Sequence, residues 1–261
     1  MTTKHLAPAK LTRSLAIVGL RSDGYHLLES EMLSVSLADT VAITEGGHGT
    51  TVHAHPGSRA EILEGGGENL CNAALRLMDR SASVEIEKYI PVGGGLGGGS
   101  SDAAAVLRWG GEFDHDRAAS LGGDVPFCLV GGRALVSGIG EVVEPIAFER
   151  LTFTLVVPDF SVNTAEVYRA FDECGVGSIH GHHRNDLRRA ARIVAPALSA
   201  LMDELERRTG TAPSLAGSGS TLFYEGTMKD VGLDEHVVLE GKRLTVIEVE
   251  TVPPGWDGRQ E

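Results

Sequence analysis

The stretch IPVGGGLGGGSSDAAAVL, Ile90–Leu107, holds six glycines among the seven residues Gly93–Gly99. The residues before it, SASVEIEKYI, alternate between apolar and polar side chains, which is typical of a half-buried strand. After the glycines, Ser100 to Asp102 can cap a helix, and Ala103–Leu107 are strong helix formers. A glycine loop between a strand and a helix start presents free backbone N–H groups at the positive end of the helix dipole. We therefore expect a phosphate site rather than a flexible linker, which would not be flanked so closely by ordered elements.

Two common phosphate loops fit this stretch poorly or weakly. A Walker A loop requires the pattern GxxxxGK[ST], but no basic residue lies between Lys88 and Arg108. A dinucleotide fingerprint GxGxxG can be traced through Gly93, Gly95 and Gly98. A run with so many glycines matches that pattern almost by chance, and the match is therefore weak. An NAD(P)-binding oxidoreductase stays an alternative.

A third pattern, P-x-x-x-G-L-x-x-x-S-S, runs from Pro91 to Ser101. It resembles the central motif of the GHMP kinases, the superfamily of galactokinase, homoserine kinase and mevalonate kinase, whose loop wraps the phosphates of ATP. The resemblance implies that ATP is bound by Pro91, Val92, Gly93, Gly94, Gly95, Leu96, Gly97, Gly98, Gly99, Ser100 and Ser101. It also places Asn69 and Lys88 near the nucleotide. From the residues alone, Asn69 could simply cap a helix, and Lys88 could be an exposed strand residue.

The composition limits the classes of protein that the chain can belong to. Its 261 residues suffice for one large or two modest domains. A net charge of −13 argues against binding to nucleic acid or to an anionic membrane. The three cysteines are widely spaced, which fits a reducing compartment. The residues MTTKHLAPAKL show no apolar signal core and no run of 18 apolar residues occurs, so we expect neither secretion nor membrane spanning. We expect a cytoplasmic monomer or weak homodimer that acts on a small molecule.

The hydrophobic pattern changes near Pro145, and this predicts a domain of residues 1–146 followed by one of residues 147–261. A long helical stretch is expected over residues 186–208, and loops over residues 46–67. The other expected elements are strands at 10–19, 27–36, 41–44, 83–90, 151–158 and 244–252, helices near 68–80, 98–108, 114–121 and 164–174, and a hairpin at 132–146.

Three further stretches narrow the resemblance within the superfamily. They are APAKLTRSL at Ala7–Leu15, RSDGYHLLES at Arg21–Ser30 and GGDVPF at Gly122–Phe127. Together with the glycine loop they resemble the 4-diphosphocytidyl-2-C-methyl-D-erythritol kinases of the non-mevalonate isoprenoid pathway. This implies an α+β, two-domain GHMP kinase fold, with a ribosomal-S5-domain-2-like domain followed by a ferredoxin-like domain. It also implies transfer of the γ-phosphate of ATP, with Mg²⁺, to the 2-hydroxyl of the methylerythritol unit.

The resemblance assigns two catalytic residues. Asp124 would take the proton of the attacking hydroxyl, and Lys10 would hold that hydroxyl and stabilise Asp124 as an anion. An aspartate after two glycines is otherwise a turn or N-cap residue, and a lone lysine is usually a surface residue. No residue pattern fixes the ligands of Mg²⁺, although Ser101 and Asp102 are candidates.

The substrate side of the site is implied in the same way. His26 would read the edge of the cytosine, with Tyr25 and Tyr168 as the two sides of an aromatic clamp. Tyr168 could equally be a core residue of its helix. The remaining substrate-binding candidates are Thr12, Thr164, Gly217, Ser218 and Gly219. Thr164 could instead be a helix cap, and the glycine pair could be an ordinary turn.

Some features depart from the family pattern or stand outside it. The family usually has asparagine where this chain has Thr12, and Arg13 stands on a strand face that should be apolar. The segment between Ser101 and Asp124 is short for the family, so a kinase of another small alcohol, or a nucleotide-binding protein without catalysis, stays an alternative. The histidines His180, His182 and His183 could bind a transition metal, but a solvated loop is favoured because no cysteine or carboxylate pair completes a site.

Overall fold

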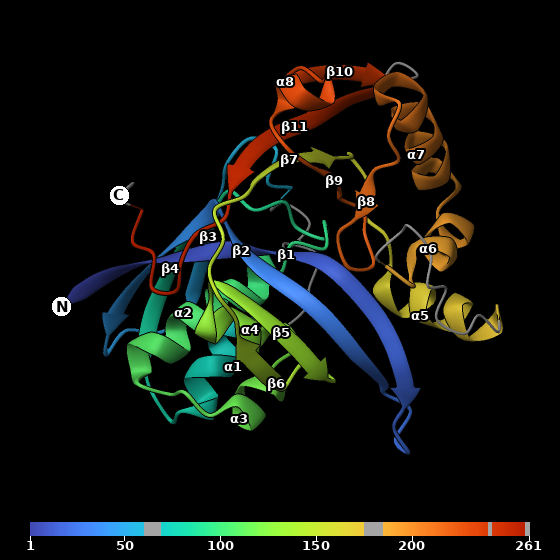
Figure 1. Ribbon diagram of the computed structural model, residues 1–261. Coiled ribbons are helices and arrows are strands. Elements are labelled where there is room, and N and C mark those ends of the chain that lie inside the picture. Colours follow the sequence, from blue (N-terminus) through green and yellow to red (C-terminus); the bar gives the residue numbers. More distant parts are fainter. Residues whose placement is uncertain (60–68, 175–184, 240–241, 259–261) are drawn as a thin grey trace.

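The fold is organised around one long antiparallel hairpin, shown in blue in the computed structural model of Figure 1. The structure describes residues 1–59, 69–174, 185–239 and 242–258. Strand β1 (Thr2–Leu20) pairs with β2 (His26–Glu45) from Thr2 opposite Thr44 to Leu20 opposite His26. The turn between them closes through a hydrogen bond from the Gly24 N–H to the Arg21 carbonyl. The stretch APAKLTRSL lies in the largely buried middle of β1, whereas RSDGYHLLES begins at the turn at the tip of the hairpin, where Tyr25 is exposed.

The first sheet is completed by four shorter strands. Its order is β3-β4-β2-β5-β6, with β1 paired to β2; β3 and β4 run parallel, and the other described neighbours are antiparallel. The added strands are β3 (Thr50–Ala54), β4 (Ala82–Lys88), β5 (Arg133–Gly138) and β6 (Val142–Pro145).

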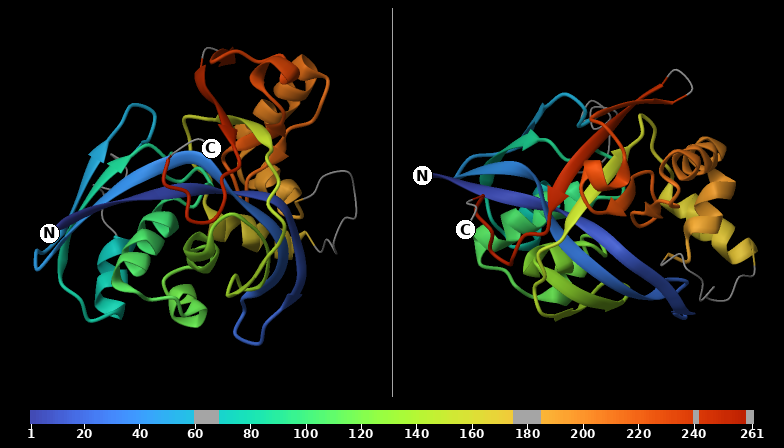
Figure 2. Two further views of the ribbon diagram at one scale, coloured as in Figure 1. Left: turned by 60° about the vertical axis from the view of Figure 1, so that its left-hand side comes forward. Right: turned by 45° about the horizontal axis from the view of Figure 1, so that its top comes forward.

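Helices cover one face of this sheet, as the two views of Figure 2 show. They are α1 (Leu70–Leu77), α2 (Gly98–Gly110), α3 (His115–Ala119) and α4 (Val125–Val130). Every residue of α2 from Ala103 to Leu107 is fully buried. Because three of these residues are alanines, α2 can pack closely against its neighbours on all sides. The glycine loop at the start of α2 is thereby held against a rigid core.

A second sheet has the order β10-β11-β7-β9-β8. Its strands are β7 (Thr152–Val157), β8 (Ser214–Leu215), β9 (Leu222–Glu225), β10 (His236–Leu239) and β11 (Lys242–Glu250). The helices of this half are α5 (Thr164–Glu173), α6 (Arg188–Val194), α7 (Pro196–Thr209) and α8 (Met228–Val231). Of these, α5 to α7 lie to one side of the sheet, as Figure 1 shows.

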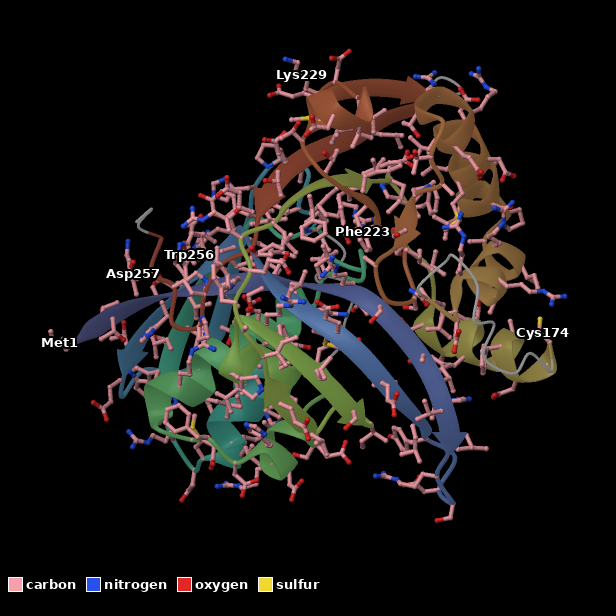
Figure 3. The ribbon with its side chains drawn as sticks, viewed as in Figure 1. Met1, Cys174, Phe223, Lys229, Trp256 and Asp257 are labelled. Carbon is pink, nitrogen blue, oxygen red and sulfur yellow. The ribbon has the colours of Figure 1, made fainter. Side chains whose placement is uncertain are left out.

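Strand β7 faces two different cores because its side chains alternate between the two faces of the sheet. Phe153 and Leu155 pack with buried residues of the first sheet, such as Leu33. Val156 instead packs against the helices of the second half. Phe223 of β9, labelled in Figure 3, also belongs to the layer between the sheets. This shared layer fixes how the two sheets meet.

Two polar connections also join the sheets. Arg13 of β1 donates to Glu225 of β9 and to Glu31 of β2, over distances of 2.8 Å and 3.1 Å. These carboxylates raise the pKa of the Arg13 guanidinium. The chain after β11 also returns to the first sheet, where the Val252 N–H donates to the Ser34 carbonyl. Arg13, which has no role in the sequence pattern, is therefore explained by a contact between sheets.

The predicted α+β class is confirmed, but several elements differ from expectation. Residues 27–44 form one strand rather than two, and β3 lies where only loops were expected. The expected long helix over residues 186–208 is two helices, because Ala195 precedes Pro196 and adopts φ −124° and ψ 86°. The chain leaves the first sheet after β6 and enters the second at β7. The domain boundary between residues 146 and 147 stays a prediction.

Candidate active site

The glycine loop joins the end of β4 to the first turn of α2. Gly93, Gly95 and Gly97 have φ values of 69°, 80° and 67°, which side chains other than glycine rarely adopt. A Cβ atom on Gly97 would lie 2.6 Å from Cγ of Lys10, so glycine is needed there for β1 to approach. The Lys10 N–H donates to the Leu96 carbonyl at 3.0 Å, which ties the loop to β1.

A cavity of about 340 Å³, here called the glycine-loop cavity, lies along this loop. All the residues predicted to bind ATP line it except Ser101, whose hydroxyl donates to the Pro8 carbonyl at 2.7 Å. Asn69 lines the cavity and also caps α1, since its side chain accepts from the Cys71 N–H. Free N–H groups at the N-terminus of the 13-residue helix α2 give the cavity a favourable field for phosphate.

Lys88 lies at the base of this cavity between two buried carboxylates. Its ammonium lies 2.5 Å from Oδ2 of Asp39 and 2.6 Å from Oδ2 of Asp102. The other oxygen of Asp39 accepts from the N–H groups of Tyr89 and Ile90, at 2.6 Å and 2.8 Å. Lys88 is therefore neither an exposed strand residue nor a free cation. It joins β2, the end of β4 and the first turns of α2, and its predicted contact with ATP stays a prediction.

The carboxyl group of Asp102 is harder to ionise in the folded protein than in water. Burial, together with the negative charge of Asp39, raises the pKa of Asp102 to about 7, although Lys88 acts in the opposite direction. The folded protein thus binds a proton that the unfolded chain releases at lower pH, so Asp102 makes folding less favourable as the pH rises toward about 7. Its Oδ1 atom has no hydrogen-bond partner in the part of the chain that is described.

We predict that the free energy of unfolding of Asp102→Asn, minus that of the wild type, is larger at about pH 8 than at about pH 5. The change in relative unfolding free energy should be on the order of 2 kcal/mol, because only the wild type must ionise a buried carboxyl. Urea unfolding at the two pH values measures this difference. The exposed Asp234→Asn variant should show no such trend, and a flat difference for Asp102→Asn would contradict the prediction.

A second cavity, of about 460 Å³, holds the predicted catalytic pair and is here called the lysine–aspartate cavity. Nζ of Lys10 lies 3.2 Å from Oδ2 of Asp124 and donates to the Thr12 hydroxyl at 3.1 Å. Lys10 is 5 % exposed, so it is not a surface lysine. Asp124 precedes α4, but its side chain makes no capping hydrogen bond. Its carboxylate is therefore directed to Lys10 and the cavity rather than to the helix.

The two cavities share three lining residues, Gly95, Gly97 and Ser100. A group bound along the glycine loop can therefore reach the Lys10–Asp124 pair directly. The predicted phosphate site and the predicted catalytic pair therefore lie along one stretch of backbone, an arrangement suited to phosphoryl transfer.

The second glycine turn closes the lysine–aspartate cavity from the side of the second sheet. Gly217 and Ser218 line the cavity, and the Ser218 hydroxyl lies 2.7 Å from the hydroxyl of Thr164. Asn163, not Thr164, caps α5 with its side chain. Gly219 does not line the cavity, because its α-carbon faces Leu215 and the core of the second half. The turn is held by Asn185, whose amide donates to the Gly217 carbonyl at 2.7 Å.

The three residues of the predicted aromatic clamp all line the lysine–aspartate cavity. His26 and Tyr168 line the cavity with their ring centroids 4.9 Å apart. Tyr168 also packs against the core of the second half, and burial raises the pKa of its hydroxyl to about 12. Tyr25 lines the same cavity but is 61 % exposed, with the guanidinium of Arg21 lying 5.5 Å from its ring centroid. Within the described residues, the ring that contacts Tyr168 from the hairpin is that of His26.

Metal-binding candidates are few. Over residues 1–59, 69–174, 185–239 and 242–258, no three histidine, cysteine or acidic side chains form a group that could hold a metal ion. The histidines His180, His182 and His183 lie outside the described residues. Of the two predicted Mg²⁺ ligands, Asp102 lines the glycine-loop cavity, whereas the Ser101 hydroxyl donates to the Pro8 carbonyl. A Mg²⁺ ion that enters with ATP would meet the oxygen-bearing side chains of Ser100 and Asp102 there, although Oδ1 of Asp102 is buried. These residues fit a metal held chiefly by phosphate oxygens.

Comparisons with known proteins show which family the chain belongs to. Residues 68–132, which include the glycine loop and Asp124, match the family of GHMP kinase N-terminal domains. A solved structure of mevalonate kinase has the same fold, with a TM-score of 0.58 at 14 % identity over 96 % of this chain and 99 % of its own. The fold and the site thus define a GHMP kinase.

Closer relatives identify the family within this superfamily. The 4-diphosphocytidyl-2-C-methyl-D-erythritol kinase of Chromobacterium violaceum is 36 % identical over 90 % of each chain, and that of Paracoccus denitrificans 34 % over 84 % of this chain and 85 % of its own. A solved structure of 4-(cytidine 5'-diphospho)-2C-methyl-D-erythritol kinase superposes with a TM-score of 0.71 at 27 % identity, covering 96 % of this chain and 100 % of that one. The chain belongs to the 4-diphosphocytidyl-2-C-methyl-D-erythritol kinase family.

Two residues of the site were missed by sequence reasoning. Asp39 shares the ammonium of Lys88, and Asp172 lies 2.7 Å from Nε2 of His26. Asp172 follows Tyr168 by four positions on a predicted helix, a spacing that places both on one face, so the sequence held a usable signal. Asp39 gave none, because its contact with Lys88 spans 49 positions. Among the described helices, none is both long and apolar enough to cross a membrane.

Proposed function

We propose that this protein transfers the γ-phosphoryl group of ATP to the 2-hydroxyl of 4-diphosphocytidyl-2-C-methyl-D-erythritol. The observation that carries the proposal is the Lys10–Asp124 pair, with Nζ and Oδ2 3.2 Å apart, in a cavity that shares Gly95, Gly97 and Ser100 with the glycine-loop cavity. ATP is the co-substrate of GHMP kinases, and the glycine-loop cavity is the place for its phosphates. The alcohol occupies the lysine–aspartate cavity.

In this arrangement Asp124 accepts the proton of the attacking hydroxyl as the oxygen attacks the γ-phosphorus atom. Lys10 lies within reach of both that oxygen and Asp124, and its charge balances the carboxylate before proton transfer. Thr12 accepts from Nζ of Lys10, so it positions the ammonium. A threonine hydroxyl serves here where the family pattern has asparagine, because one acceptor is enough to hold the lysine.

On the nucleotide side, the N-terminus of α2 and the loop N–H groups stabilise the charge on the transferred group. Mg²⁺, when bound, neutralises charge on the phosphates. Ser100 and Asp102 are the residues we propose to hold it, together with the phosphates themselves. Lys88 contributes by fixing the first turns of α2 through Asp102 rather than by standing free in the cavity.

The cytidine end of the substrate lies at the outer part of the lysine–aspartate cavity, where Tyr25, His26 and Tyr168 gather. An aromatic face there stacks on the base, and His26 meets its edge. The Thr164–Ser218 hydroxyl pair, at the start of α5, faces the diphosphate. The cytoplasmic location and the monomeric or weakly dimeric state stay predictions from the sequence, as does the absence of nucleic-acid and membrane partners.

The test is the release of ADP from ATP and Mg²⁺ with four alcohols offered separately. These are 4-diphosphocytidyl-2-C-methyl-D-erythritol, mevalonate, homoserine and galactose. We expect turnover with the cytidylyl substrate alone. Turnover with another alcohol only would keep the kinase and overturn its proposed substrate, and ATP binding without any turnover would contradict a catalytic role.

A further inference from the structure

His26 at the start of β2 lies against one face of helix α5. Its Nε2 atom lies 2.7 Å from Oδ1 of Asp172, and its side chain is only 12 % exposed. Its ring lies on Tyr168 at a tilt of 36° and meets the ring of Phe171 edge-on, with centroids 6.0 Å apart. Three side chains of one helix therefore fix the position of the imidazole and the plane of its ring.

The carboxylate of Asp172 determines which ring nitrogen of His26 carries the proton. An ionised carboxylate can only accept hydrogen bonds, so Nε2 must be the donor in the contact with Asp172. In the neutral ring, Nδ1 is then left as an acceptor. No described residue hydrogen-bonds to Nδ1, and His26 lines the lysine–aspartate cavity. His26 therefore provides a hydrogen-bond acceptor, Nδ1, to the lysine–aspartate cavity, and its ring cannot easily rotate.

An acceptor at Nδ1 of His26 limits which base of the substrate can pair with it. The edge of cytosine carries one donor, the exocyclic amino group, and otherwise acceptors. An acceptor nitrogen on the protein can therefore pair with cytosine only at that amino group. Uracil has a carbonyl oxygen at the same position, and a second acceptor facing it would be left unpaired and repelled.

We propose that Asp172 is a positioning residue that makes the enzyme select cytosine over uracil, by holding His26 in the tautomer whose Nδ1 accepts from the amino group. The inference rests on the proposed function, since it supposes a cytidylyl substrate. Asp172 does not itself touch the substrate in this account, and 54 % of its side chain is exposed. It acts through the proton on Nε2.

The kinetic test compares kcat/KM for the cytidylyl substrate with kcat/KM for its uridine analogue. Asp172→Asn keeps the shape of the side chain, but its amide can donate to Nε2, which allows the tautomer with a proton on Nδ1. We expect the cytidine-to-uridine ratio to fall about tenfold, the value of one well-placed hydrogen bond. The KM for ATP should be unchanged. Asp172→Glu, which restores an acceptor-only group, should recover most of the ratio.

Glu173→Gln is the matched control, because it removes one exposed carboxylate from the next position of α5. Its ratio should equal that of the wild type. A loss of general charge at the end of the helix would affect both variants alike, whereas loss of the His26 contact affects only Asp172→Asn.

A second readout needs no substrate. NMR chemical shifts of the imidazole nitrogens distinguish the two tautomers, and His26→Gln identifies the signal by its disappearance. We expect a proton on Nε2 in the wild type and a shift toward Nδ1 in Asp172→Asn. If the wild type turns over the cytidylyl substrate but the ratio is the same in Asp172→Asn, the inference is overturned and the proposed function stands. If the wild type does not turn over that substrate, the proposed function fails, and the inference fails with it.

Discussion

Asp124→Asn should lower kcat by about 10²–10⁴-fold, the usual contribution of a positioned general base. The amide has the shape of the carboxylate but cannot accept the proton of the attacking hydroxyl. The glycine-loop cavity does not include Asp124, so the KM for ATP should change little. The side chain makes no capping hydrogen bond to α4, so the helix loses nothing when the charge is removed.

Steady-state ADP release with a varied concentration of each substrate measures both constants. Asp116→Asn, which removes an exposed carboxylate from α3, is the control and should retain wild-type kcat. Thermal unfolding of both variants checks that the fold is intact. Wild-type kcat in Asp124→Asn would exclude Asp124 as the general base and leave it the role of a loop residue before α4.

The local part of the fold could be predicted because local rules decide it. The strand, the glycine loop and α2 follow from alternation, glycine conformations and alanine propensity, all read within about 25 positions. The hairpin of β5 and β6 and the helix α5 likewise carry their own signals. The break between α6 and α7 was missed although Pro196 marks it, because the apolar spacing of the two helices runs on through the proline.

Contacts between distant segments were not predictable in the same way. The position of Arg13 is explained by its hydrogen bond to Glu225 of β9, which lies 212 positions away in the sequence. Lys88 was placed near the nucleotide by resemblance, but the sequence alone could not show that Asp39 and Asp102 already hold its charge. A buried cation must be paired, so this outcome is required once burial is known. Burial at that depth depends on the packing of the whole first half of the chain.

The lysine–aspartate pair shows a different case. Lys10 and Asp124 are 114 positions apart, and only resemblance to a family of kinases brought them together before the structure did. The distance of 3.2 Å between Nζ of Lys10 and Oδ2 of Asp124 cannot be predicted from composition or from hydrophobic periodicity. The contact between the rings of His26 and Tyr168, with Asp172 hydrogen-bonded to His26, was likewise not visible in the sequence, and the aromatic clamp stays a prediction.

In the glycine loop, the added methyl group of Gly95→Ala should strongly lower both stability and activity. Gly95 has φ 80°, and a Cβ atom there would lie 2.4 Å from the Ala216 carbonyl oxygen and 2.8 Å from that of Gly219. Both neighbours are backbone atoms and cannot move aside as a side chain can. Gly95→Ala should therefore cost about 1–3 kcal/mol for the backbone conformation and a similar amount for the overlap. The loop would have to separate from the turn that closes the site.

We expect Gly95→Ala to lower Tm by about 5–15 °C and kcat/KM by at least about 10²-fold, because a displacement near 1 Å at the junction of the cavities misaligns the reacting groups. Gly99→Ala is the matched control for stability. Gly99 lies in α2, has no positive φ, and a Cβ there would meet only Leu70 Cδ1 at 3.8 Å. Alanine is the better helix former, so Tm should rise slightly in Gly99→Ala. Equal Tm values for the two variants would mean that the loop and the closing turn are not packed together as Gly95 requires. Differential scanning fluorimetry of the two proteins decides between these outcomes, and ADP release measures kcat/KM of Gly95→Ala against the wild type, since only a close backbone contact destabilises one glycine variant and spares that of its neighbour four positions away.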